Sequence, residues 1–132
     1  MKKRTENILL NIIGIFFILL GLAEFILAIY NGKYQDFFWF CYSGHILIGL
    51  GILFRNSYLV LIETNLLLIP LIIWDIDFFY ILFTGNSLGI ANYFFIEKVP
   101  LISSLISLHH IYTPLLLFFV FYSSTHQNIT VL

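Results

Sequence analysis

The sequence predicts an all-α membrane protein, a compact bundle of four transmembrane helices in a single domain over residues 1–132. Hydrophobic residues make up 61% of the chain and charged residues only 10%, where a soluble domain has about 25% charged residues. The mean hydropathy is +0.99, and a chain this short has no soluble core large enough to bury so many apolar side chains. Four apolar runs approach or exceed the roughly 20 residues that a helix needs to cross a bilayer.

The predicted spans cover residues 7–30, 37–54, 58–83 and 100–122. The first run follows the basic MKKR and is longer than the apolar region of about 7–15 residues in a signal peptide, so we expect it to remain as an uncleaved span. Short polar turns, NGKYQD and RNS, connect the first three spans. The last connection, TGNSLGIANYFFIEKV, is longer and partly apolar, and we expect it to contain a segment in the membrane interface.

Basic residues indicate how the chain is oriented in the membrane, and small residues indicate how its helices pack. Basic residues near the span ends number four on the side of both termini and two on the other side: Lys2, Lys3, Arg4 and Arg55 against Lys33 and Lys98. Because cytoplasmic ends carry more lysine and arginine, both termini are expected in the cytoplasm. Glycines, alanines and serines in the spans favour close helix packing within the lipid bilayer, in the monomer, a homo-oligomer or a membrane complex. The net charge of −1 gives no indication of nucleic-acid binding.

Ionisable side chains inside spans are expensive, so they face protein or water and mark candidate sites. At about 1.5 Å per residue from the outer end, those of this chain fall roughly 9–15 Å deep, in one layer about 6 Å thick. Glu63 is the exception and lies near the inner end of its span. The candidates for binding a ligand or a proton are Glu24, His45, Asp75, His109 and His110, with Asp77, Trp74 and Tyr112 as secondary candidates. This common depth predicts one polar cluster in the outer half of the bundle.

Asp75 and Asp77 stand two positions apart in the apolar run LIIWDIDFFYILF. Residues two apart on a helix point about 200° apart, so both cannot face one cavity. We expect Asp75 to point inward, where the indole of Trp74 or a histidine could donate to it, and Asp77 to reach water or headgroups. In the alternative, the third helix ends at Trp74 and both aspartates lie at headgroup level.

The histidines allow several cofactors. His45, His109, His110 and Asp75 could hold a divalent metal ion, or two histidines of facing spans could bind haem, although no H-x-x-x-H or H-E-x-x-H motif is present. Pro114 cannot donate to the carbonyl of His110, which predicts a bend there. Cys41, the single cysteine, is expected to be a packing residue.

Three functions therefore fit the sequence. The polar cluster could bind or move a proton, a metal ion or a small polar ligand; it could fasten the helices of a structural or accessory subunit; or it could serve a haem- or metal-dependent intramembrane enzyme. Four short helices leave little room for a large substrate cavity, which disfavours the enzyme.

Overall fold

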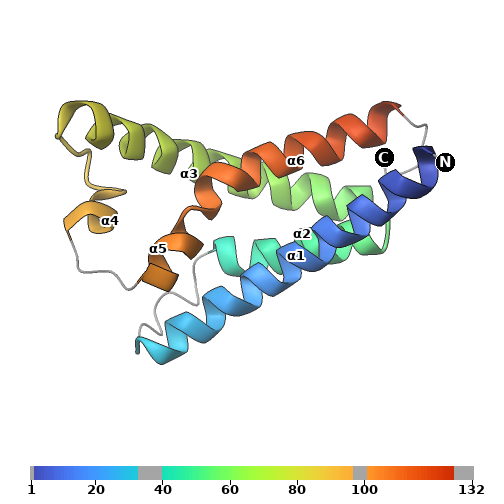
Figure 1. Cartoon of the computed structure of the whole chain (residues 1–132), viewed down its shortest axis with the longest axis horizontal. Helices are drawn as coiled ribbons and strands as arrows, with labels where there is room; N and C mark the ends of the chain where they lie inside the picture. The colour runs from blue at the N-terminus through green and yellow to red at the C-terminus, as the bar shows by residue number, and fades with distance from the viewer. Residues whose placement is uncertain (1, 33–39, 97–100, 127–132) are drawn as a thin grey trace. The chain divides into compact units, whose positions relative to one another are not determined.

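The computed structural model describes residues 2–32, 40–96 and 101–126, and every secondary-structure element in these ranges is a helix (Figure 1). In chain order the helices are α1 (Lys2–Tyr30), α2 (Phe40–Leu53), α3 (Ser57–Thr84), α4 (Asn92–Ile96), α5 (Leu101–Ser107) and α6 (His109–His126). They belong to two compact units: Met1–Leu67 with Leu116–Leu132 form the first, and Leu68–Leu115 form the second.

Three helical stretches are long and apolar enough to cross a membrane. They are Arg4–Tyr30, Ser57–Thr84 and Leu101–Tyr122, and the last contains both α5 and α6. The second predicted span is represented by a shorter apolar helix, Cys41–Leu53, and its predicted start at residue 37 lies outside the described residues. The helical class is confirmed, while the count of four spans stays a prediction.

In the first unit, α1 and α2 lie side by side and meet through glycines (Figure 1). A Cβ atom at Gly49 would lie 2.6 Å from the carbonyl oxygen of Gly14, and one at Gly21 would lie 2.6 Å from that of Tyr42. The two backbones can come this close only because these positions lack side chains. The buried apolar residues of the two helices include Leu10, Phe17, Ile48 and Ile52.

Two side chains shape the turn between α2 and α3. Arg55 has a φ of 55°, and its guanidinium donates to the carbonyl of Ile52 at 3.1 Å and to Oδ1 of Asn11 on α1 at 2.9 Å. Asn56 caps the start of α3, because its Oδ1 accepts the amide of Leu59 at 3.1 Å. The polar turn predicted from the sequence is therefore anchored to both helices before it.

The helix α3 is continuous through Pro70 and past Trp74 to Thr84. The alternative in which the third helix ends at Trp74 is therefore wrong. No glycine or proline follows Trp74 until Gly85. Gly85 has a φ of 72°, and its amide donates a hydrogen bond to the carbonyl of Ile81 at 2.8 Å, so it caps the helix in the left-handed conformation.

The fourth predicted span consists of two helices rather than one. The helix α5 ends at Ser107, Leu108 forms a turn, and α6 begins at His109. The helix α6 continues through Pro114, and the interruption at Leu108 lies two residues before His110, where the bend was predicted.

Candidate functional site

A buried carboxyl–imidazole pair joins α1 and α2. Oε2 of Glu24 lies 3.0 Å from Nδ1 of His45, and the two residues are 2% and 0% exposed. The ring of Phe17 stacks on the imidazole with its centroid 5.8 Å away. When Glu24 is ionised, its carboxylate only accepts hydrogen bonds, so Nδ1 carries the hydrogen and the lone pair of the neutral ring lies on Nε2.

Glycines beside the pair explain how it forms. Gly21 lies one helical turn before Glu24 and rests against the backbone of α2, and Gly44 directly precedes His45. A Cβ atom at Gly44 would lie only 2.8 Å from Cδ1 of Leu67 on α3. Close approach of the helices brings the short Glu24 side chain within reach of the imidazole.

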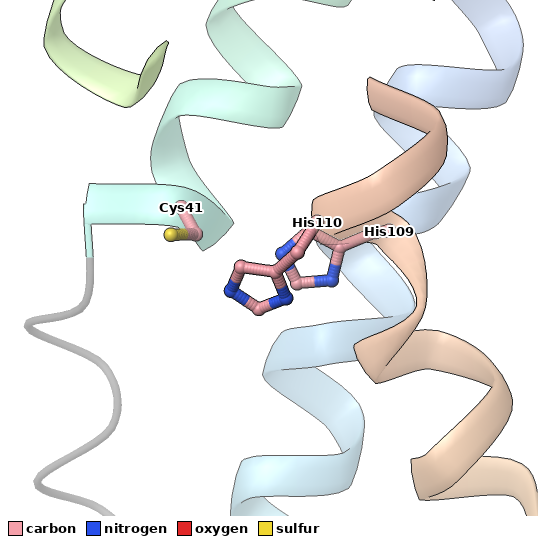
Figure 2. Close-up of side chains that lie close together, drawn as sticks. All are labelled: Cys41, His109 and His110. Carbon is pink, nitrogen blue, oxygen red and sulfur yellow. The ribbon is translucent and has the colours of Figure 1, made fainter. Parts of the chain in front are cut away.

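His109 and His110 lie at the start of α6 with their rings one against the other (Figure 2). The ring centroids are 3.9 Å apart. Nδ1 of His109 donates to the carbonyl of Ile106, and Nδ1 of His110 donates to that of Ser107, each at 2.8 Å. A carbonyl only accepts, so both rings carry their hydrogen on Nδ1. The two histidines thereby cap the last carbonyls of α5.

Trp74 connects α3 with α4 and with His110. Its indole N–H donates to the hydroxyl of Tyr93 at 3.1 Å. Its ring stacks with that of Phe78 at 5.0 Å and with that of His110 at 4.4 Å between centroids. The sequence left the Trp74 indole or a histidine as donors to Asp75; the first alternative is wrong, because the hydroxyl of Tyr93 on α4 accepts the indole N–H.

The aspartates of α3 also differ from their predicted roles. Asp77 is 0% exposed, and its carboxylate accepts the backbone amides of Leu88, Ile90 and Ala91 at 2.6, 2.7 and 2.7 Å. Asp75 is half-buried, and among the described residues its Oδ1 has no hydrogen-bond partner. The expectation that Asp77 reaches water or headgroups is wrong, because the chain after the helix folds back and surrounds it with donors.

The five main candidates for binding a ligand or a proton belong to different units. Glu24 and His45 belong to the first unit, whereas Asp75, His109 and His110 belong to the second. That these five residues form one cluster, with or without a metal ion, stays a prediction.

Two further residues of the sequence analysis have simpler surroundings. Tyr112 is half-buried in the first turn of α6, where its amide donates to the carbonyl of Leu108 at 3.4 Å. Cys41 is buried near the start of α2, as a packing residue would be (Figure 2).

Sequence reasoning missed Tyr93 and Arg55 as contributors to this arrangement. A signal for Tyr93 was available, because a buried indole needs an acceptor and the NYFF stretch supplies a tyrosine hydroxyl. Arg55 was assigned only to the charge count at the membrane surface, although its long side chain can also reach back along the helices.

These features define the class of protein: in its described part, an all-helical chain with three helical stretches of membrane-spanning length and with buried histidine and carboxyl side chains. Comparison with protein-family models, with curated proteins and with solved structures gives no match. The function is therefore inferred from these side chains.

Proposed function

We propose that the chain is a multi-pass integral membrane protein of four spans, with both termini in the cytoplasm, that binds a divalent transition-metal ion through histidine Nε2 atoms. The apolar composition and the three long apolar helices support the membrane assignment. The excess of basic residues near the span ends on the side of the termini supports the orientation. Labelling of single cysteines at the two ends in intact cells or vesicles tests it, and opposite locations contradict it.

One observation supports the metal ion above the other ligands. Each spanning histidine whose side chain is described has Nδ1 hydrogen-bonded to a fixed acceptor: the Glu24 carboxylate for His45, and backbone carbonyls for His109 and His110. Histidines that bind metals almost always have this arrangement, because the bond at one ring nitrogen fixes the tautomer and orients the other nitrogen toward the ion. Ionisable groups inside spans also commonly mark ion sites and pathways.

The donor chemistry selects the class of ion. Imidazole nitrogens suit zinc, copper, nickel and iron, while calcium and magnesium prefer oxygen ligands. One ring nitrogen of His109 and one of His110 lie within 4.8 Å of each other, which makes the two residues candidates for ligands of one ion. The Glu24 carboxylate behind His45 makes that imidazole a stronger ligand.

Metal binding by the full-length protein in detergent tests the proposal. Co²⁺, whose visible absorption reports its coordination, is the probe, and Zn²⁺ competes for the same ligands. His45→Gln, and His109→Gln with His110→Gln, are each expected to weaken binding at least about tenfold, since even second-shell changes weaken metal binding about 10–100-fold. His126→Gln, a histidine outside the candidate set, is the matched control.

Two results contradict the proposal. One is unchanged Co²⁺ affinity in the candidate variants, and the other is an equal loss in the His126→Gln control. The metal-to-protein ratio shows how many ions the histidines hold. A Soret absorption band in the purified protein would replace the metal ion with haem as the histidine-bound group.

A structural role is the second candidate function, because the Glu24–His45 bond runs directly between α1 and α2. Polar pairs of this kind can fasten helices in a membrane without binding a ligand. This role predicts that the wild-type protein binds no Co²⁺. It also predicts that Glu24→Leu lowers the free energy of unfolding.

A further inference from the structure

The membrane-length stretch Leu101–Tyr122 is interrupted in its interior. The helices α5 and α6 follow one another within it and are separated at Leu108 (Figure 1). A break of this kind removes backbone hydrogen bonds where no water replaces them, and each unsatisfied group there costs several kcal/mol. Something must therefore donate to the last carbonyls of α5.

The donors are imidazole rings. In a continuous helix, the carbonyl of Ile106 would accept the amide of His110, and the carbonyl of Ser107 would accept the amide of Ile111. In the structure, Nδ1 of His109 donates to the first carbonyl and Nδ1 of His110 to the second, each at 2.8 Å. The amide of Ile111 donates to the carbonyl of Leu108 at 3.0 Å.

Stacking holds both rings in this position. The ring of His110 lies 4.4 Å from that of Trp74 on α3, at an interplanar angle of 18°. The ring of His109 lies 3.9 Å from that of His110. The break is thus fixed by side chains that also connect it to α3.

Each of the two carbonyls can be satisfied by one of two donors, a ring N–H in the broken form or a backbone amide in a continuous helix. We propose that the imidazoles of His109 and His110 keep this span broken at Leu108, and that an ion bound at their Nε2 atoms stabilises the broken form. The second clause rests on the proposed function. A ligand at Nε2 keeps the hydrogen on Nδ1, which is the hydrogen that the carbonyls of α5 accept.

Pulsed electron paramagnetic resonance tests the proposal in the full-length protein. Spin labels replace Leu101 and Leu115, which are 74% and 67% exposed, in a Cys41→Ala background. A continuous helix would separate the two Cα atoms by about 21 Å. Three versions are compared: wild-type histidines, His109→Leu with His110→Leu, and His109→Asn with His110→Asn. Asparagine keeps a nitrogen donor at the position of Nδ1 and has no atom at the position of Nε2.

Without metal, the leucine pair is expected to shift the label distances to those of a continuous helix, and the asparagine pair to keep the wild-type distances. Zn²⁺ is expected to narrow the wild-type distance distribution and to leave that of the asparagine pair unchanged. Wild-type distances in the leucine pair would overturn the proposal.

If the variant with His109→Leu and His110→Leu does not fold, the wild-type protein tests the proposal. Zn²⁺ that binds without narrowing the distribution of label distances overturns the proposal. A wild-type protein that binds no Zn²⁺ overturns the proposed function and the ion-dependent clause. The leucine and asparagine pairs then still decide whether the imidazoles keep the span broken.

Discussion

The carboxylate of Asp77 on α3 accepts the backbone amide of Ala91, fourteen residues further along the chain, at 2.7 Å. The amides of Leu88 and Ile90 bind the same carboxylate. Three donors therefore surround a side chain that is fully buried. An aspartate is tolerated in this apolar run because backbone amides take the place of water around it.

Asp77→Asn is expected to destabilise the protein by about 1–3 kcal/mol or more. The amide group of asparagine can accept through one oxygen, but its NH₂ group cannot accept and would face backbone amides. At least one amide of the loop then loses its acceptor. Thermal unfolding in detergent measures the effect.

Asp75→Asn is the matched control. The sequence predicts Asp75 as the inward aspartate and so the larger effect at Asp75, whereas the burial of Asp77 predicts the larger effect at Asp77. Asp75 is half-buried and its Oδ1 has no hydrogen-bond partner in the described parts of the chain. Its substitution is expected to change the free energy of unfolding by less than about 1 kcal/mol. A larger effect at Asp75 than at Asp77 would show that the loop contacts do not stabilise the fold.

Gly49→Ala is expected to separate α1 from α2. The added Cβ would lie 2.6 Å from the carbonyl oxygen of Gly14 and 2.7 Å from Cγ1 of Ile18, and a backbone oxygen cannot turn away as a side chain can. Overpacking of this kind costs about 1–3 kcal/mol. Thermal unfolding measures it, with Ile12→Ala, at a 57% exposed position on α1, as the control. Equal stability of the two variants would contradict the close approach of the helices.

Hydropathy and helix length predicted most of the helical architecture. Long apolar runs form these helices even though α1 contains Gly14 and Gly21 and α3 contains Pro70, and both helices cover all of their predicted residues. The break at Leu108 was not predictable from the same signals, because Leu108 is an ordinary helix former. The break depends on side-chain donors from His109 and His110, and hydropathy does not report such bonds.

The candidate site was also predictable only in part from the sequence. Counting depth along the spans predicted Glu24 and His45 about 3 Å apart in height, and the structure pairs them. The rotation of about 200° between Asp75 and Asp77 did not predict the burial of Asp77, since its three donors come from the loop after α3. Helical periodicity predicts which residues share a helix face, but not what a loop brings to that face.

The Glu24–His45 pair is expected to show strong energetic coupling. Removing one partner of a buried pair leaves the other uncompensated and costs about 3–5 kcal/mol, whereas replacing both partners by apolar residues costs much less. Glu24→Leu and His45→Leu should therefore each destabilise the metal-free protein by that amount, and the double variant by much less than the sum of the two. Thermal unfolding with a chelator present measures all three. Additive effects would mean that the contact contributes no stability.

The last prediction concerns the hydrogen on each imidazole. The groups beside Nδ1 are the Glu24 carboxyl group at His45 and backbone carbonyls at His109 and His110, and the carbonyls, like the carboxyl group when it is ionised, can only accept. All three neutral rings should therefore carry hydrogen on Nδ1 and the lone pair on Nε2. Nitrogen-15 NMR of histidine-labelled protein distinguishes the two tautomers, and single His→Gln variants assign the signals. Added Zn²⁺ should shift the Nε2 signals and leave the Nδ1 signals protonated. A hydrogen on Nε2 of any of the three neutral rings would contradict the hydrogen bonding described for that ring and remove it as an Nε2 ligand.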